Sequence, residues 1–251
     1  MSVHDTARRG FASAADVYED SRPGYPAEAI AWLADQLELR PDRTVVDLAA
    51  GTGKLTRPLT PTGATVIAIE PVDEMRDALT RTTPGADARP GTAERTGLPD
   101  ASADAVTVAQ AFHWFDGPAA LAEIHRVLRP AGRLALVWNI RDLDDPVQHD
   151  IDQLFTRYRG DTPSHRSGRW RTALKKTDLF ASRARTEFPN VQQLDADSLV
   201  RRVASTSFIA ELPEPERRRV LDRARAIADA LPKRFDFPYT TEIEVYDRAG
   251  P

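Results

Sequence analysis

Strand-like and helix-like segments alternate through the middle of this chain of 251 residues, and no other feature of the sequence restricts its fold as strongly. Four short, mostly apolar runs are typical of buried strands: Val45–Leu48, Thr65–Ile69, Asp104–Ala109 and Arg133–Trp138. Two of the segments between them, Asp73–Thr80 and Ala119–Leu128, predict helices. Repeated alternation of this kind is typical of a parallel sheet with helices on both faces, so we predict an α/β fold.

The last third of the chain has a different character. Residues 141–180 are polar and rich in arginine and lysine, and two helices are predicted after them, near Asp197–Glu211 and Glu214–Ala230. A late strand is predicted near Thr240–Tyr246. We interpret these segments as the completion of the same sheet together with helical insertions, so the chain is predicted to form one domain.

Composition excludes several classes of function. The sequence has no cysteine, which rules out disulfides, thiolate nucleophiles and cysteine-ligated metal sites. Its 34 basic and 38 acidic side chains give a net charge of −4, which offers no general attraction for nucleic acid or a membrane surface. The N-terminus lacks the apolar stretch of a signal peptide, and no segment has the apolar length of a membrane span. A soluble, cytoplasmic protein is therefore expected.

A glycine-rich turn, AAGTG, follows the first predicted strand and carries the strongest chemical signal. Gly51 and Gly53 allow a sharp bend and the close approach of a ligand, and the first amides of the next helix favour an anion. Asp47, on the strand itself, is suited to accept a hydrogen bond from an ammonium group. Glu70 ends the next strand, where a carboxylate can bind both hydroxyls of a ribose.

Together these groups match S-adenosylmethionine, which carries a carboxylate, an ammonium group and a ribose. NAD fits less well, because its G-x-G-x-x-G pattern would require a third glycine at Thr56. The alternative is a glycine turn needed only for packing, with Asp47 and Glu70 as ordinary solvated acids at strand ends.

The ordered motifs resemble those of the class I S-adenosylmethionine-dependent methyltransferases. More narrowly, they are similar to the small-molecule branch that includes ubiquinone/menaquinone-biosynthesis and trans-aconitate-type enzymes. The matching stretches are Asp47–Gly53, Glu70-Pro71, Gly91–Phe115 and Arg126–Asn139, and together they cover most of residues 11–140. Ala49 stands where the family usually has its first glycine.

The resemblance implies a Rossmann-like, mostly parallel, seven-stranded sheet with helices on both faces and a C-terminal antiparallel strand. Within a single domain of residues 1–251, residues 1–40 would form an N-terminal lid over the cofactor. Residues 41–140 would form the cofactor-binding core, and residues 141–180 and 197–234 would be helical insertions on the substrate side.

The resemblance also implies a set of cofactor-binding residues along the chain. In the turn and at the end of the second strand they are Asp47, Ala49, Gly51, Thr52, Gly53, Glu70 and Pro71. Near the adenine they are Met75, Thr92, Ala93 and Glu94, although the family often has an aspartate where Thr92 stands. Beside the methionine end they are Gln110, Ala111 and Phe112, and in the lid they are Tyr18, Arg22 and Tyr25. Met75 is equally compatible with a plain helix core, and the lid residues with a surface helix and turn.

The expected reaction is an in-line displacement that transfers a methyl group to a small molecule and leaves S-adenosylhomocysteine. His113 follows the fourth strand and is the candidate general base, with shaping of the pocket as the alternative. Trp114 and Phe115 are predicted to line the acceptor pocket or else to be core aromatics. The basic cluster from Arg157 to Lys176 either attracts an acidic acceptor or is a solvated helix and loop. The histidines show no spacing for a metal site, so no metal is predicted.

Two other functions remain open from the sequence. The first is a non-catalytic S-adenosylmethionine-binding protein, because no residue is certain to activate an acceptor. The second is an NAD(P)-dependent oxidoreductase, which the missing third glycine disfavours. The identity of the acceptor, the atom that is methylated and the choice between monomer and homodimer are not set by this sequence.

Overall fold

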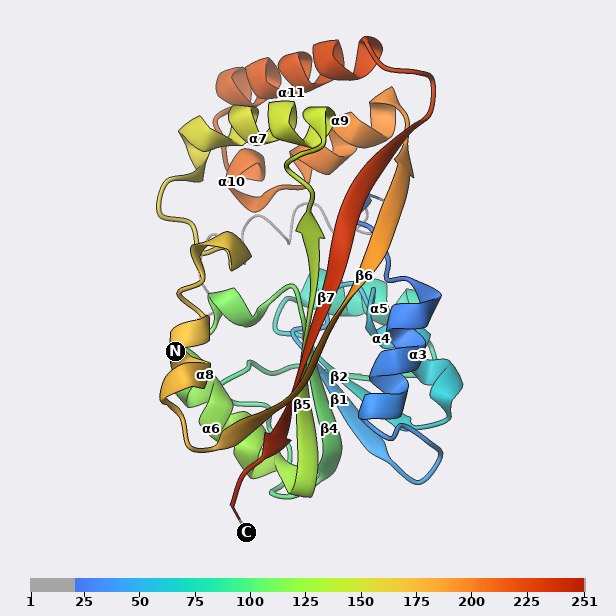
Figure 1. Ribbon diagram of the computed structural model, residues 1–251, viewed down its shortest axis with the longest axis vertical. Coiled ribbons are helices and arrows are strands. Elements are labelled where there is room, and N and C mark those ends of the chain that lie inside the picture. Colours follow the sequence, from blue (N-terminus) through green and yellow to red (C-terminus); the bar gives the residue numbers. More distant parts are fainter. Residues whose placement is uncertain (1–20, 251) are drawn as a thin grey trace.

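A computed structural model describes residues 21–250, and the structural statements below concern those residues. A seven-stranded sheet forms its centre, with the order β3-β2-β1-β4-β5-β7-β6 (Figure 1). The strands are β1 (Thr44–Leu48), β2 (Thr65–Ile69), β3 (Asp87–Arg89), β4 (Ala103–Ala109), β5 (Leu128–Arg141), β6 (Phe180–Leu194) and β7 (Phe235–Arg248). The first five are parallel to one another, and β7 runs antiparallel to both β5 and β6. The predicted fold class is confirmed.

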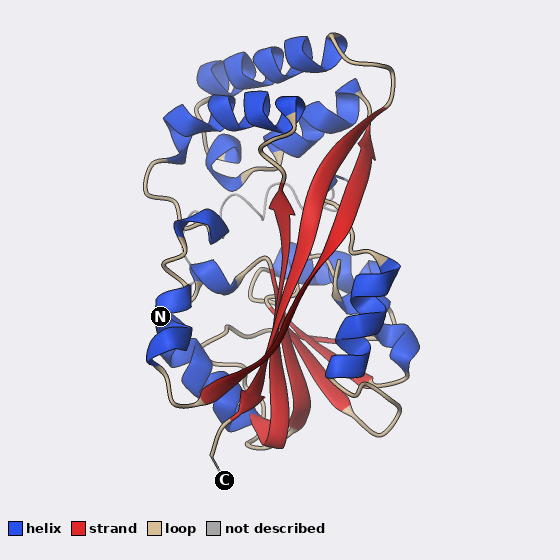
Figure 2. Ribbon diagram, in the orientation of Figure 1, coloured by secondary structure: helices blue, strands red, loops and turns tan. Residues whose placement is uncertain are grey.

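Helices surround this sheet and form a separate group beyond one end of it (Figure 2). Those of the first half are α3 (Ala27–Gln36), α4 (Thr56–Leu59), η1 (Thr60–Thr62), α5 (Asp73–Thr82), η2 (Phe112–Trp114) and α6 (Gly117–Val127). Those of the second half are α7 (Pro146–Arg159), η3 (His165–Ser167), α8 (Arg171–Lys176), α9 (Ala196–Ala204), α10 (Ser207–Ala210) and α11 (Glu214–Asp229). No helix in this described part is long and apolar enough to cross a membrane.

Two hydrophobic cores cover the two faces of the sheet, because successive strand residues point to opposite sides. In β1, Val45 joins the core that α3 and α4 cover, whereas Val46 and Leu48 join the core that α6 covers. Both faces are apolar because both are buried, which is why the parallel strands are continuous hydrophobic runs in the sequence.

A third hydrophobic cluster lies beyond the ends of the parallel strands. It joins α7, α9, α10 and α11 to the far ends of β6 and β7, and we call this group of elements the cap. The long strands β6 and β7 run from the main sheet into the cap (Figure 1). The cap is therefore held over the sheet by the sheet's own strands.

The sequence predictions hold for β1, β2, β4, α5 and α6 to within two residues. Strand β6 was not predicted, because it lies at the sheet edge and carries charged residues and Pro189. The predicted helix at residues 197–211 is divided into α9 and α10 at Ser205 and Thr206. The division into lid, core and insertions stays a prediction.

Candidate active site

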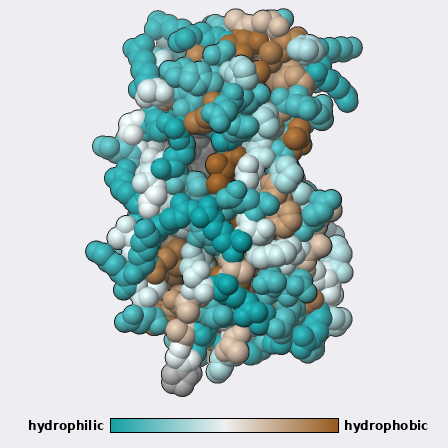
Figure 3. Space-filling view, viewed as in Figure 1, coloured by the Kyte–Doolittle hydropathy of each residue, from teal (hydrophilic) through white to brown (hydrophobic). Residues whose placement is uncertain are grey.

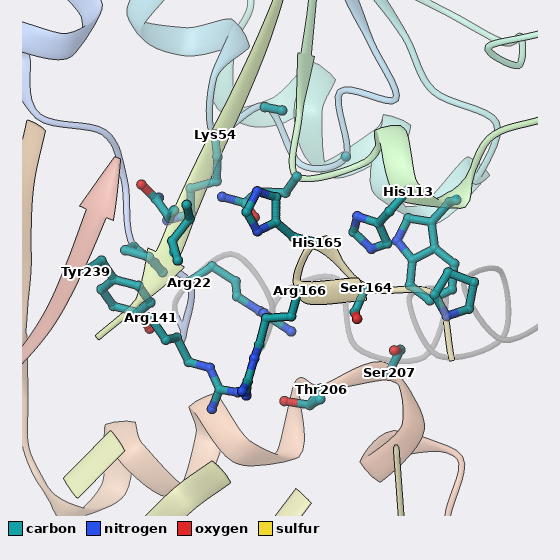
Figure 4. A pocket seen from close by; sticks show the side chains of 18 of the residues that line it. Arg22, Lys54, His113, Arg141, Ser164, His165, Arg166, Thr206, Ser207 and Tyr239 are labelled. Atoms are coloured by element: carbon teal, nitrogen blue, oxygen red, sulfur yellow. The ribbon is translucent and has the colours of Figure 1, made fainter. Parts of the chain in front are cut away.

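A cavity of about 360 Å³ lies between the sheet and the cap (Figure 4). Its walls come from the turn after β1, the exit of β4, the end of β5, the cap and residues 22–25. On the face shown in Figure 3 the surface is mostly hydrophilic and is hollowed between the upper and lower parts of the molecule. A volume of this size is typical of small-molecule sites.

The cavity lies where the order of the strands reverses. The chain builds β1, β2 and β3 outward in one direction and then returns to place β4 on the other side of β1. Loops at the carboxyl ends of β1 and β4 therefore diverge and leave a crevice, which is the usual ligand site of open α/β sheets. Gly51 and Thr52 line it from one loop, and Gln110, His113 and Trp114 from the other.

The glycine turn has the backbone conformation that the sequence predicts. Gly51 and Gly53 both have positive φ angles, of 58° and 89°. A Cβ on Gly53 would lie 3.0 Å from Thr83 Oγ1, so this position requires glycine for space as well as for conformation. Ala49, which replaces the family's usual glycine, also has a positive φ of 55° and lines the cavity.

Glu70 holds the turn from the end of β2. Its Oε2 accepts a hydrogen bond of 2.8 Å from the Gly51 N–H, and its Oε1 accepts one of 2.9 Å from the Val72 N–H. Burial raises the pKa of Glu70 to about 7, although these two hydrogen bonds oppose the shift. The carboxylate is therefore a buried acid and does not lie at a solvated strand end. It does not line the cavity itself, and its predicted contact with a ribose stays a prediction.

Asp47 lies on β1, as the sequence predicts, and its carboxyl is hydrogen-bonded within the protein. It is buried beneath the turn and accepts hydrogen bonds from Thr56 Oγ1 at 2.6 Å and Thr107 Oγ1 at 2.9 Å. Burial raises the pKa of this carboxyl to about 6. Asp47 does not line the cavity, and its hydrogen bonds connect β1 to α4 and β4. Its contact with a ligand ammonium group stays a prediction.

The exit of β4 divides its aromatic side chains between the cavity and the core. Gln110, with a positive φ of 57°, lines the cavity together with His113 and Trp114. Phe112 instead packs in the core at 5.6 Å from the Phe115 ring, and neither of the two lines the cavity. Phe115 therefore has the core position that the sequence offered as its alternative, and the cofactor contact predicted for Phe112 stays a prediction.

His113 is a partly buried imidazole of the cavity wall. Its ring centroid lies 4.9 Å from that of Trp114 and 5.5 Å from that of Trp138. Burial, followed by the charge of His165, lowers the pKa of His113 to about 3. Its Nδ1 has no hydrogen-bond partner among the described residues. The imidazole is thus neutral over the physiological range, with a buried ring nitrogen available to a ligand.

The residues predicted near the adenine lie outside this cavity. Met75 and Ala93 are buried, and Ala93 packs in the same core as Ile67 and Ile69. Thr92 and Arg95 form an isolated β-bridge, and Glu94 Oε1 accepts a hydrogen bond of 3.1 Å from the Asp116 N–H. The cofactor contacts predicted for Pro71, Met75, Thr92, Ala93, Glu94 and Ala111 stay predictions.

The predicted lid is represented by Arg22 and Tyr25, which line the cavity, whereas Tyr18 lies outside the described residues. This segment is fixed across the sheet and the cap. The carbonyl of Gly24 accepts hydrogen bonds of 3.0 Å from Asn139 and from Asn190, and Arg22 Nη2 donates one of 2.7 Å to the Ser205 carbonyl. The position of the two residues agrees with a segment that closes the cavity.

Some residues of the basic cluster 157–176 line the cavity and others do not. Arg159 and Arg166 line the cavity, whereas Arg171 pairs with Glu242 and Glu244 at 2.9 and 2.7 Å. Sequence reasoning missed several other lining residues: Arg141, His165, Arg202, Thr206 and Tyr239. They come from the end of β5, η3, the cap and β7, and no local motif marks them in the sequence.

Comparison with known proteins assigns the chain to a family. The sequence profile of a methyltransferase domain matches residues 46–136, which include the glycine turn and the β4 exit. An uncharacterised methyltransferase of Mycobacterium tuberculosis is 41% identical over 222 residues, which are 88% of this chain and 86% of that protein. The chain belongs to the class I methyltransferase family. The narrower biosynthetic branch stays a prediction.

Solved structures agree with the fold of this methyltransferase. A structure named as a type II methyltransferase from Anaeromyxobacter dehalogenans has a TM-score of 0.66 and 26% identity, covering 90% of this chain and 97% of that one. Geranyl diphosphate C-methyltransferase from Streptomyces coelicolor, in complex with Mg²⁺, geranyl diphosphate and S-adenosylhomocysteine, shares the fold at a TM-score of 0.52. It is 14% identical, covering 89% of this chain and 79% of that one. Within residues 21–250 of the methyltransferase, no group of three His, Asp or Glu side chains is placed to hold a metal ion.

Proposed function

We propose that this methyltransferase transfers the methyl group of S-adenosylmethionine to a small-molecule acceptor. The observation that carries the proposal is that the turn after β1 and the exit of β4 line one cavity at the point where the strand order reverses. The complex of the geranyl diphosphate enzyme with S-adenosylhomocysteine supports this donor for the fold. The volume of the cavity supports a small acceptor.

The residues of the turn are suited to hold the donor. Glu70 uses one lone pair on each oxygen for the Gly51 and Val72 amides, so both oxygens retain a lone pair for the hydroxyls of a ribose. Asp47 is proposed as a positioning residue that fixes the strand and helix on either side of the turn. Gln110, beside the turn, is proposed to contact the methionine end.

In-line transfer depends on alignment and on the exclusion of water. When bound, the donor supplies a methyl carbon activated by its sulfonium. The cap and the segment of Arg22 and Tyr25 both line the cavity and are joined by the hydrogen bond from Arg22 to the Ser205 carbonyl, and Trp114 is proposed to limit the positions that an acceptor can take. These side chains orient the acceptor and restrict the entry of water.

The chemistry of His113 favours an acceptor that needs little activation. A histidine with a pKa of about 3 is a weak base, because its conjugate acid loses the proton readily. Its buried Nδ1 is still able to accept a hydrogen bond from an acceptor hydroxyl or amine. We therefore propose that His113 orients the nucleophile first and removes a proton only from an acceptor that is already acidic.

Calorimetric titration with S-adenosylhomocysteine, S-adenosylmethionine and NADH tests the donor. Saturable binding of the first two and none of NADH is expected, and no binding of either adenosyl compound at millimolar concentration would overturn the proposal. Release of S-adenosylhomocysteine in the presence of an acceptor panel then tests transfer. Donor binding without transfer to any compound in the panel would favour the non-catalytic alternative.

A further inference from the structure

The lining of the cavity carries an excess of positive charge. Six cationic side chains line the cavity: Arg22, Lys54, Arg141, Arg159, Arg166 and Arg202. No aspartate or glutamate is among the described lining residues. In Figure 4, Arg141 and Arg166 extend toward the same region, with Thr206 and Ser207 on the cap side.

One carboxylate serves three of these guanidinium groups. Asp152, on α7, lies 2.5 Å from Arg141 Nη2, 2.6 Å from Arg159 Nη2 and 2.9 Å from Arg166 Nη1. A single negative charge therefore faces three positive charges. Asp152 can hold the three side chains in place, but it does not neutralise them.

Arg202 adds a fourth positive charge without an acid of its own. It is 8% exposed, and its Nε donates a hydrogen bond of 3.1 Å to the Tyr239 hydroxyl, a neutral group. No carboxylate pairs with it among the described residues. Burial and the charge of Arg202 lower the pKa of Arg141, which shows that the two guanidinium groups repel each other. A buried positive charge is unfavourable unless a group of opposite charge pairs with it.

Two polar atoms of the same wall that lack partners indicate what that partner is. Arg141 Nη1, a donor, and Thr206 Oγ1, which can donate, are buried atoms that have no hydrogen-bond partner among residues 21–250. Both residues line the cavity. Donors without partners around a positive centre are complementary to an anion rich in acceptor oxygens, and arginine fits carboxylate and phosphate groups with paired hydrogen bonds.

We propose that Arg141, Arg166 and Arg202 form an anion-binding site for the methyl acceptor, which therefore carries a carboxylate or phosphate group. The site deepens the proposed function, on which it depends, by naming the chemical class of the acceptor. The anionic group binds on the cap side of the cavity. The nucleophilic atom of the acceptor is then directed toward Gln110 and His113 at the sheet side.

Binding to protein saturated with S-adenosylhomocysteine tests this site, because the donor's own carboxylate is then already bound. The probes are succinate, citrate and inorganic phosphate, with succinamide as the neutral match for succinate, and calorimetry is the readout. At least one anion is expected to bind saturably while succinamide does not, and the anion that binds most tightly distinguishes carboxylate from phosphate. Raising the salt concentration is expected to weaken the binding.

Arg202→Gln and Arg166→Gln are the site variants, and Arg218→Gln on α11 is the matched control, because Arg218 is exposed and pairs only with Glu214 among the described residues. Each site variant is expected to bind the anion about tenfold or more weakly, while the control binds as the wild type does. Arg166 is half exposed, so its variant reports on binding even where Arg202→Gln folds poorly.

Three results would overturn the site: no saturable binding of any anion, equal binding of succinamide, or unchanged affinity in both site variants. S-adenosylhomocysteine affinity is measured separately in every variant. If the wild-type protein binds an anion but not S-adenosylhomocysteine, the proposed function is contradicted and the anion site is left standing. The reverse result would remove the anion site alone.

Discussion

At the scale of single residues, Glu70 combines a structural and a proposed binding role in one buried carboxyl group. Glu70→Gln is expected to weaken S-adenosylhomocysteine binding about tenfold or more, because hydrogen bonds to a charged acceptor contribute about 1.5–3 kcal/mol. Since burial raises the pKa of Glu70 to about 7, wild-type affinity is expected to fall as the pH drops below about 7, and the variant is expected to lose this dependence. Calorimetry between pH 6 and 8 measures both effects.

The control for Glu70 is Glu74→Gln, the same chemical change at an exposed position on α5. It is expected to leave both the affinity and its pH dependence unchanged. Equal affinity of the Glu70 and Glu74 variants would show that Glu70 only supports the turn.

His113 gives a second prediction at this scale, on stability in acid. Its folded-state pKa of about 3 lies below the ordinary value of 6.5, so the unfolded chain binds the proton more readily than the folded protein. The stability that the neutral imidazole contributes is present above pH 6.5 and is lost as the pH falls toward 3. His113→Phe is therefore expected to lose less unfolding free energy than the wild type between pH 7 and 4, by on the order of 3 kcal/mol. Urea denaturation at both pH values measures the difference, and equal losses would contradict it.

At the scale of elements, the two glycines of the turn between β1 and α4 have different roles, one in stability and one in ligand binding. Gly53→Ala is expected to destabilise the protein by about 2 kcal/mol or more, because φ is 89° and the new Cβ would crowd Thr83 and Leu79. Gly51 has a φ of 58° and lines the cavity, but a Cβ added there would meet no atom within 4 Å. Gly51→Ala is expected to reduce donor affinity more than Gly53→Ala does and to reduce stability less.

Thermal denaturation and calorimetry on the two glycine variants measure these effects. A Gly51 variant that binds the donor as tightly as the wild type would show that the ligand does not approach this backbone closely.

The same elements show how much of the molecule the sequence predicts. Strands such as β1 and β4 are buried on both faces, so each is an apolar run that can be recognised in the sequence. The residues that follow such runs, including Gly51 and His113, can therefore be predicted from the local sequence. Strand β6 is an edge strand of alternating exposure without an apolar run, so its pattern resembles a polar loop. Arg202 and Tyr239 are 37 residues apart and meet only because β7 runs into the cap. The cap side of the cavity therefore depends on tertiary packing, and no spacing of residues in the sequence predicts it.

At the scale of the whole molecule, the cap has its own hydrophobic cluster, whereas the glycine turn depends on the cores of the main sheet. Leu199, fully buried on α9, belongs to the cap cluster, and Leu199→Ala is expected to destabilise the protein by about 2–5 kcal/mol. The void left by the shortened side chain lies within the cap. We therefore expect backbone amides of the cap to lose most of their protection from hydrogen exchange. Hydrogen exchange should become faster in α7, α9 and α11 and remain slow in β1 and β4.

Leu121→Ala on α6 is the matched comparison, the same truncation in the core of the main sheet. It is expected to increase exchange in β4 and β5 and to lower donor affinity, whereas Leu199→Ala is expected to keep the donor and to weaken anion binding. This opposite pattern follows because the donor is proposed to bind the sheet, while Arg202 is carried by α9 itself. Uniform loss of protection in both variants would instead show that cap and sheet open as one cooperative unit through β6 and β7, and that the two halves of the cavity cannot be perturbed separately.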